Sequence, residues 1–153
     1  DQPSDDILCL FCKSIRCNYF RGNLNNVVER FIQAASFYNA KFIIRINADS
    51  PLIDPKIISS VIDNHDKNCD ITSNVFPRTY PKGQSVEIIK LSSLKKIVNN
   101  FNFNKDHAEH VTQYFYENSS KYKIKNVFNT NRKLSDLNLS IDTIEDYNRL
   151  TIK

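Results

Sequence analysis

The chain has 153 residues, of which 41% are hydrophobic and 25% charged, as in ordinary globular proteins. This composition excludes a disordered chain, and the apolar runs are too short to span a bilayer. The net charge of +4 is modest for a nucleic-acid-binding protein, so we expect neither nucleic acid nor a membrane as partner. The start of the chain lacks the basic residues of a signal peptide, which favours a cytoplasmic location.

Hydrophobic spacing in the first half of the chain predicts helices that alternate with strands. In chain order the segments are a helix over residues 5–14, a strand over 17–21, a helix from 24 to about 39, a strand over 41–46, a helix over 56–68 and a strand over 70–74. The run over 41–46 is rich in β-branched residues, which is typical of a strand buried on both faces. Asp54 and Pro55 provide an N-cap and a first-turn proline for the helix that follows them.

The second half opens with a loop over residues 76–83 that contains two prolines and a glycine. The segments after it are a strand over 85–90, a helix over 92–100, a helix from a capping box of Asp106 and Glu109 to 118, a strand over 122–128, a strand over 139–141 and a helix capped by Thr143 and Asp146. Such alternation favours an α/β fold, with a parallel sheet covered by helices. We expect one domain over residues 1–153.

Two aspartates stand at predicted strand ends, where an open α/β sheet binds its ligands. Asp49 follows the strand over 41–46, although an Asx turn ahead of Pro51 explains it equally well from spacing alone. Asp142 precedes the capping pair of the last helix and has no evident structural task. Mg²⁺ binds few carboxylates together with waters and substrate phosphates. We therefore expect the two side chains to converge on one cation, as nucleotidyl transfer requires.

Other site chemistries have weaker support in the sequence. Cys9 and Cys12 have CxxC spacing, and His65 with Cys69 could complete a zinc site. The apolar neighbours of the CxxC pair favour buried thiols instead. With only two glycines, the chain carries no P-loop, dinucleotide-binding fingerprint or nucleophile elbow.

Several segments together resemble the acylneuraminate cytidylyltransferase superfamily, in the branch similar to spore coat polysaccharide biosynthesis protein F. The segments are FRG (20–22), VVERF (27–31), RINADSPLIDP (45–55), DITSN (70–74), RTYPKGQSVE (78–87), EHVT (109–112), YEN (116–118) and IDTIED (141–146). They keep the order and spacing of the family and cover nearly the whole chain. The resemblance implies a nucleotide-diphospho-sugar transferase-like fold, which is a Rossmann-like three-layer sandwich.

The same resemblance implies transfer of a cytidylyl group from CTP to an acidic sugar, giving a CMP-sugar for surface polysaccharide, with Mg²⁺ as cofactor. Asp49 and Asp142 match the aspartates that hold the metal in related synthetases, and they are the predicted catalytic pair. The positions that match the family's substrate side are Arg21, Arg45, Asn47, Arg78, Tyr80, Glu87 and His110. Related synthetases also form homodimers, and the aromatic residues within 76–118 predict a dimer interface and substrate border there.

The chain departs from the family pattern in two places. Ser85 stands where the family usually has aspartate, which indicates different sugar contacts or loop geometry. The family's first strand and phosphate loop would precede Asp1, and methionine is absent, so we expect an N-terminally truncated domain that neither turns over CTP nor binds it tightly. The alternatives are a glycosyltransferase on the same fold and a non-catalytic sugar-binding or dimerisation module.

Overall fold

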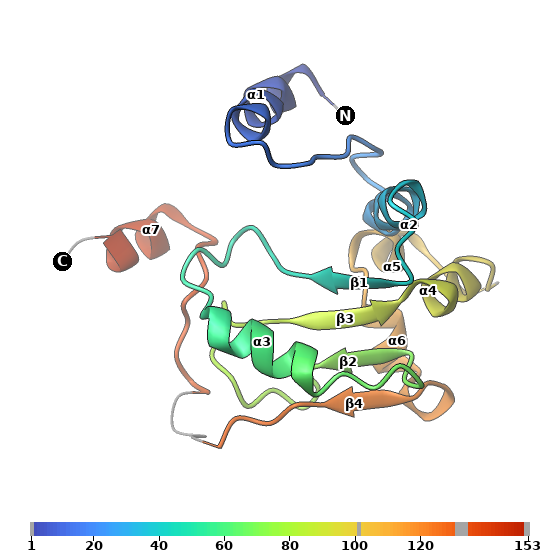
Figure 1. The fold of residues 1–153 in the computed structure, drawn as a ribbon. Coiled ribbons are helices and arrows are strands. Elements are labelled where there is room, and N and C mark those ends of the chain that lie inside the picture. Colours follow the sequence, from blue (N-terminus) through green and yellow to red (C-terminus); the bar gives the residue numbers. More distant parts are fainter. Residues whose placement is uncertain (1, 101, 131–134, 152–153) are drawn as a thin grey trace. The chain divides into compact units, whose positions relative to one another are not determined.

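The computed structural model describes residues 2–100, 102–130 and 135–151. The chain divides into two compact units, one of Asp1–Lys41 with Leu91–Tyr114 and one of Phe42–Lys90 with Phe115–Lys153. Each unit is therefore assembled from two separate stretches of sequence. The colours of Figure 1 follow the sequence, so the stretches can be traced along the chain.

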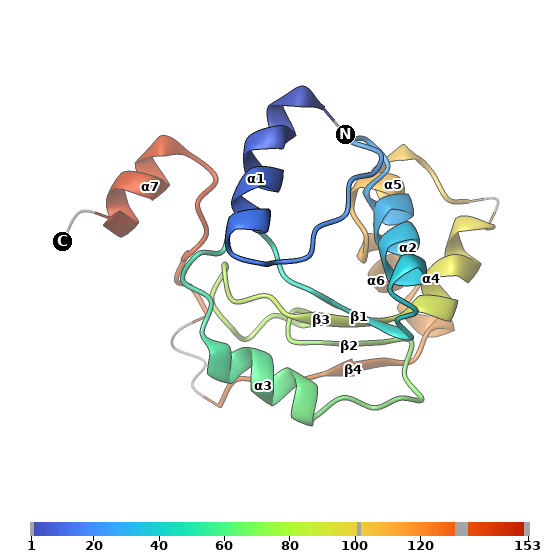
Figure 2. The same ribbon diagram turned by 45° about the horizontal axis from the view of Figure 1, so that its top comes forward.

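The first unit is helical in the residues that the structure describes. Its elements are the 3₁₀ turn η1 (Pro3–Asp5), α1 (Asp6–Ser14), α2 (Val27–Phe37), α4 (Leu91–Val98), α5 (Lys105–Glu109) and the first part of α6 (Gln113–Glu117). The Asn26 side chain caps α2 by accepting a hydrogen bond from the Glu29 amide, 3.0 Å. From there α2 packs against α4 and α5, as Figure 2 shows. The side chains buried in these contacts are Val28, Ala35, Leu91, Leu94 and Ile97.

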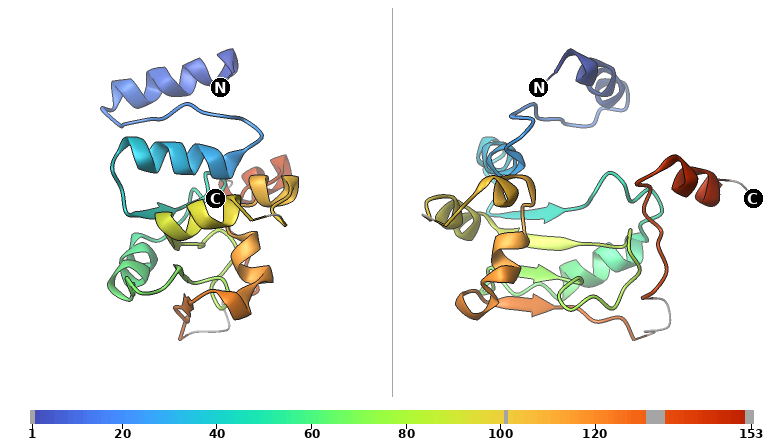
Figure 3. Two further views of the ribbon diagram at one scale, coloured as in Figure 1. Left: turned by 90° about the vertical axis from the view of Figure 1, so that its right-hand side faces the viewer. Right: turned by 180° about the vertical axis from the view of Figure 1, so that it is seen from behind.

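The second unit contains a four-stranded sheet. Its strands are β1 (Phe42–Arg45), β2 (Ile71–Ser73), β3 (Glu87–Lys90) and β4 (Ile124–Asn126), in the spatial order β1-β3-β2-β4. β3 is antiparallel to both β1 and β2, whereas β2 and β4 are parallel. The remaining elements are α3 (Pro55–Asp63), the end of α6, the 3₁₀ turn η2 (Ser119–Lys121) and α7 (Ile144–Thr151). In Figure 3, α3 covers one face of the sheet and the end of α6 lies on the other.

The core of the second unit lies between α3 and the sheet. Its buried residues are Val61, Val86, Ile88 and Val127, with Phe42, Ile53, Ile57 and Ile58 packed against them. The predicted N-cap of α3 is confirmed, because the Asp54 side chain accepts a hydrogen bond from the Lys56 amide, 2.8 Å, with Pro55 in the first turn. The helix ends at Asp63, five residues before its predicted end.

The predicted α/β class is correct, but the prediction of a parallel sheet is wrong. The sheet is mixed because β3 lies antiparallel between β1 and β2. β1 therefore stands at an edge, and its Ile44 side chain is 45% exposed, so this strand is not buried on both faces. β-branched residues favour any strand, and the pairing direction is set by contacts distant in sequence.

Three predicted segments also differ from the structure. Residues 17–21 and 139–141 form no strand. The helix expected from 106 to 118 is divided into α5 and α6, because His110 leaves helical geometry at φ −96° and ψ 83°. The cap of α5 is Asn104, whose side chain accepts from the His107 amide, 3.0 Å, in place of the predicted Asp106 and Glu109 pair. In the described ranges, no helix combines the length and apolar character that crossing a bilayer requires.

Candidate active site

Polar residues are paired across the sheet at the end where β1 and β2 stop and β3 begins. This end of the sheet is at the left of Figure 1. Arg45 is paired with Glu87, and Glu87 is paired with Ser73 on its other side. Residues paired across neighbouring strands project from the same face of a sheet. The register therefore places these three polar side chains together, beside the loops that leave this end of the sheet.

The Glu87 carboxylate is at the centre of these three side chains. It is 2% exposed, and its two oxygens accept from different partners. Arg45 Nη1 lies 2.5 Å from Oε2, and the Tyr116 hydroxyl of α6 donates to Oε1 at 2.6 Å. A buried carboxylate is stable only when it is paired and hydrogen-bonded, and Glu87 meets both conditions. Sequence analysis placed Arg45 and Glu87 in the site but did not include Tyr116.

Tyr116 is held from two sides. Burial, together with the nearby Glu87 carboxylate, raises the pKa of the Tyr116 phenol above its ordinary value. Its hydroxyl therefore stays protonated and can donate to Glu87 at neutral pH. The Tyr116 ring stacks on Phe76, with centroids 4.7 Å apart and an interplanar angle of 18°. This contact joins α6 to the start of the loop between β2 and β3.

That loop is fastened to its surroundings by buried amides. The Asn74 side chain donates to the Gln84 carbonyl at 2.7 Å and accepts from the Val86 amide at 2.9 Å. The Gln84 side chain in turn accepts from the Asp54 amide and donates to the Leu52 carbonyl, both at 2.8 Å. The loop is thereby joined to the segment that follows Asp49.

Arg78 crosses the same loop. Its Nη1 and Nη2 atoms both lie 3.2 Å from the Ser85 hydroxyl oxygen, and Nη1 also donates weakly to the Pro81 carbonyl at 3.4 Å. Hydroxyl and carbonyl oxygens are neutral acceptors, so these contacts orient the guanidinium without compensating its charge. The Arg78 side chain is exposed to solvent.

The loops of Asp49 and Asp142 run side by side although the residues are far apart in sequence. The Ile141 amide donates to the Asp49 carbonyl oxygen, 2.8 Å. The Asp49 carboxylate accepts from the Ser50 hydroxyl at 2.8 Å, and the Asp142 carboxylate accepts from the Ser140 hydroxyl at 3.0 Å. The backbone bond joins the two loops, and the convergence of the two carboxylates on one cation stays a prediction. Asp142 does not follow a strand, because residues 139–141 form none.

Lys82 is a further functional candidate that sequence analysis missed. Its Nζ lies 2.6 Å from an Asp142 carboxylate oxygen, so Asp142 is not the unoccupied carboxylate that its position predicted. This hydrogen bond raises the pKa of Lys82, and the Asp49 carboxylate adds to the effect. The same bond, with that from Ser140, lowers the pKa of Asp142. The Lys82 ammonium therefore contacts Asp142 and is also influenced by the Asp49 carboxylate.

The two carboxylates fit Mg²⁺ by the chemistry of their oxygens, because this cation is commonly held by one or two carboxylates, waters and substrate phosphates. In the part of the chain that the structure describes, no group of three or more histidine, cysteine or acidic side chains could hold a metal ion. A cation at Asp49 and Asp142 would thus depend on water and substrate for its other ligands. It would also compete with Lys82, whose ion pair with Asp142 is exposed and easily exchanged.

The first turn of α7 supports a pH prediction. Hydrogen bonds from Arg149 and from the Asp142 and Thr143 amides hold the pKa of Asp146 at about 2, below the ordinary 3.8. A lowered pKa means that the charged form stabilises the fold above the ordinary pKa, and that this contribution is lost as pH falls toward 2. We expect Arg149→Met to raise the Asp146 titration midpoint, measured by carboxyl-carbon NMR. Lys95→Met, in the other unit, should leave the midpoint in place, and an unchanged midpoint in Arg149→Met would contradict the prediction.

The other predicted substrate residues occupy varied environments. Tyr80 is only 9% exposed, and its hydroxyl lies 3.5 Å from the Phe128 carbonyl, so it packs as a core residue. Asn47 is half-buried in the loop that carries Asp49. Arg21 and His110 belong to the first unit, where Arg21 pairs with Asp6 at 2.5 Å.

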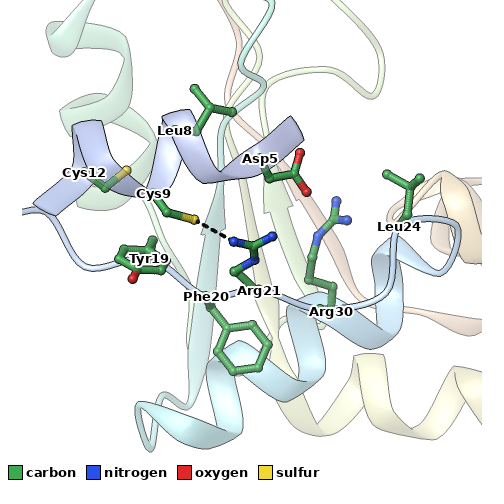
Figure 4. Close-up of a pocket in the computed structure, with 10 residues that line it drawn as sticks. Asp5, Leu8, Cys9, Cys12, Tyr19, Phe20, Arg21, Leu24 and Arg30 are labelled. Carbon is green, nitrogen blue, oxygen red and sulfur yellow. Dashed lines mark hydrogen bonds between the residues drawn. The ribbon is translucent and has the colours of Figure 1, made fainter. Parts of the chain in front are cut away.

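The first unit contains an open pocket of about 360 Å³ between α1, the segment after it and α2. Figure 4 shows that the Arg21 and Arg30 side chains point into it near Asp5. Arg21 also donates to the Gln2 carbonyl at 2.7 Å and approaches Cys9 Sγ at 3.6 Å. Sequence analysis selected Arg21 only because the FRG segment resembles the family. Residue spacing could not predict the pocket, because a loop and two helices form it together.

The cysteines do not form a zinc site in the described residues. All four are free thiols, and no suitable cluster of ligands lies near them. Cys9 and Cys12 are partly exposed rather than buried in a core, because α1 buries none of its side chains. The hypothesis of buried thiols in α1 is therefore wrong.

Open α/β sheets bind their ligands beyond the carboxyl ends of the strands, and the polar side chains described above lie at the end of the sheet where β1 and β2 stop. Residues 1–152 match the family described as Cytidylyltransferase, and the chain belongs to this family. It is 33% identical to a solved cytidylyltransferase from Leptospira borgpetersenii serovar Hardjo-bovis, with a TM-score of 0.91 over 98% of this chain and 63% of that one. The match to that solved structure confirms the nucleotide-diphospho-sugar transferase-like fold that the resemblance implied.

Two relatives of known sequence cover nearly the whole chain. The uncharacterized protein MJ1063 of Methanocaldococcus jannaschii is 32% identical over 95% of this chain and 59% of its own length. The spore coat polysaccharide biosynthesis protein SpsF of Bacillus subtilis is 29% identical over 96% of this chain and 61% of its own length. The chain thus spans about three fifths of the length of these relatives.

Proposed function

We propose that the protein transfers a cytidylyl group from CTP to an acidic sugar and so makes a CMP-sugar for surface polysaccharide. The observation that carries the proposal is the 2.8 Å hydrogen bond from the Ile141 amide to the Asp49 carbonyl, which joins the two aspartate loops. In a member of the cytidylyltransferase family, two carboxylates carried on loops that are joined in this way suit a cation and a triphosphate. The name of SpsF, a polysaccharide biosynthesis protein, supports a carbohydrate acceptor.

In the proposed reaction a sugar hydroxyl oxygen attacks the α-phosphorus of CTP. A new P–O bond forms to the sugar, the bond to the β-phosphate oxygen breaks, and pyrophosphate leaves, while the hydroxyl proton passes to solvent. Asp49 and Asp142 would hold Mg²⁺, which offsets negative charge on the phosphates when it is bound. Lys82, beside both carboxylates, adds a second positive charge to the same region.

The test is pyrophosphate release by the whole protein given CTP, Mg²⁺ and a nonulosonic acid. We expect Asp49→Asn and Asp142→Asn each to lower kcat/KM at least about a hundredfold, because each removes a negative ligand without changing side-chain size. Asp54→Asn is the matched control, since asparagine caps a helix as well as aspartate does, and it should stay within about twofold of wild type.

Wild-type protein that releases no pyrophosphate with any acidic sugar would contradict the proposal. So would aspartate variants that remain as active as the control. An assay of residues 1–153 alone, run beside the whole protein, tests separately whether this chain is inactive by itself.

A homodimer is also part of the proposal, and the burial of side chains indicates which surface supports it better. Three of the aromatic residues expected at the interface are buried within the chain itself: Tyr80, Tyr114 and Phe115. Exposed apolar side chains lie instead on α1, including Ile7, Leu10 and Phe11. This face supports contact with a second copy better than residues 76–118 do.

A further inference from the structure

The arginines predicted on the substrate side differ in whether their charge is compensated. Arg21 pairs with Asp6 at 2.5 Å, and Arg45 pairs with the buried Glu87 at 2.5 Å. Arg78, by contrast, donates only to Ser85 and Pro81 oxygens among the described residues. Among the described residues, the Arg78 guanidinium therefore has no carboxylate partner, and it is exposed.

A paired and an unpaired arginine respond differently to an anionic ligand. A carboxylate that approached Arg45 would meet the Glu87 carboxylate on the same guanidinium, and two like charges close together repel. A carboxylate that approached Arg78 would replace contacts to neutral oxygens with charge-assisted hydrogen bonds, which are roughly twice as strong. The planar fork of arginine also suits both oxygens of a carboxylate at once.

The position of Arg78 also suits the binding of a carboxylate near the proposed site. Its acceptor Pro81 immediately precedes Lys82, which contacts Asp142 at 2.6 Å. Its other acceptor, Ser85, follows Gln84, which fastens the loop to the Asp54 amide at 2.8 Å. Arg78 is thus carried on the same loop as the lysine at the paired aspartates, and the loop is held in place from both ends.

We propose that Arg78 is the specificity-determining residue that binds the carboxylate of the acidic sugar, and that Ser85 permits this by leaving the Arg78 charge free. In this proposal Arg45, Glu87 and Tyr116 stabilise the end of the sheet through their hydrogen bonds, and Arg45 does not bind the sugar carboxylate. This inference rests on the proposed function, because it assigns the acceptor's charged group to one side chain.

The test compares a nonulosonic acid with its methyl ester, which keeps the sugar and removes the charge. We expect wild-type protein to prefer the acid by at least about tenfold in kcat/KM, as a charge-assisted contact implies. Arg78→Gln and Ser85→Asp should both bring the ratio near one, the second because a carboxylate at position 85 would occupy the guanidinium. Ser85→Asn, of similar size without the charge, should retain the preference. The effect should lie in KM for the sugar, with KM for CTP within about twofold.

If Arg78→Gln kept the preference for the acid, the inference would be overturned. It would also be overturned if Ser85→Asp and Ser85→Asn reduced that preference equally. A wild-type protein that treats acid and ester alike would overturn it too. Pyrophosphate release with either sugar would still support cytidylyl transfer, so the failure of this inference remains distinct from failure of the proposed function.

Discussion

Glu87→Ala is expected to destabilise the protein by about 3–5 kcal/mol, the usual effect of removing one partner from a buried ion pair. The substitution leaves Arg45, whose side chain is only 22% exposed, without its carboxylate. It also removes the acceptor of the Tyr116 hydroxyl. Urea unfolding followed by circular dichroism measures the change, and the midpoint should fall while the slope stays constant.

Two further variants separate the charge effect from lost packing. Tyr116→Phe leaves one Glu87 oxygen unsatisfied and should cost less, about 1–3 kcal/mol. The double variant Arg45→Met with Glu87→Leu removes both charges and should recover most of the loss, because replacing a buried pair by apolar groups is often neutral. If Glu87→Ala cost under about 1 kcal/mol, or if the double variant were less stable than Glu87→Ala, the ion-pair explanation would be wrong.

The features that sequence analysis predicted well depend on neighbours within one or two helical turns. The spacing of apolar residues located α2, and its N-cap contact joins residues three apart. Thr143 and Asp146 were predicted to cap the last helix, and the Asp146 amide does donate to the Thr143 hydroxyl at 3.2 Å. The partners in such contacts are neighbours in sequence, so the local sequence indicates them.

The sheet order could not be predicted in the same way. The alternation of helices and strands suggested parallel pairing, but β3 follows a long loop and inserts between β1 and β2 in the opposite direction. Arg45 and Glu87 are 42 positions apart, and their register depends on that insertion. No periodicity within either strand encodes it.

The candidate site likewise contains residues that the local sequence indicated and partners that only the structure revealed. Asp49 could be selected because it lies between a strand and a helix, and Asp142 because it precedes the last helix without being part of the predicted capping pair. The resemblance supported both. The partners of the site came only from the structure, since Lys82 contacts Asp142 across 60 positions and Tyr116 contacts Glu87 across 29. A lysine in a loop and a tyrosine in a helix are common on any surface, so neither residue type signals its role.

Gly83→Ala should be the second severe substitution, with a loss of about 2–4 kcal/mol, because it adds left-handed strain and a steric overlap. Gly83 has a φ of +88°, and an added Cβ would lie 2.5 Å from the Leu139 carbonyl carbon and 2.7 Å from the Ser140 nitrogen. These are backbone atoms and cannot rotate away. Lys82 pairs with the same segment, accepting from the Leu139 amide at 2.8 Å and donating to the Leu137 carbonyl at 3.0 Å.

Relief of this overlap must separate residues 82–83 from 139–140, and the separation would draw Asp142 away from Lys82 and from the Asp49 loop. We therefore expect Gly83→Ala to lower kcat/KM for CTP as well as stability, even at temperatures where the variant remains folded. Gly22→Ala is the control, because its Cβ would meet side-chain atoms of Arg30, at 3.0 Å, and of Gln33, at 3.4 Å, and no backbone atom is among these nearest neighbours. The loss should stay below about 1 kcal/mol. Thermal unfolding and pyrophosphate release, measured on both variants, decide the matter. Equal losses in the two variants would mean that residues 139–140 move aside freely, and that the close approach at Gly83 does not align the aspartate pair.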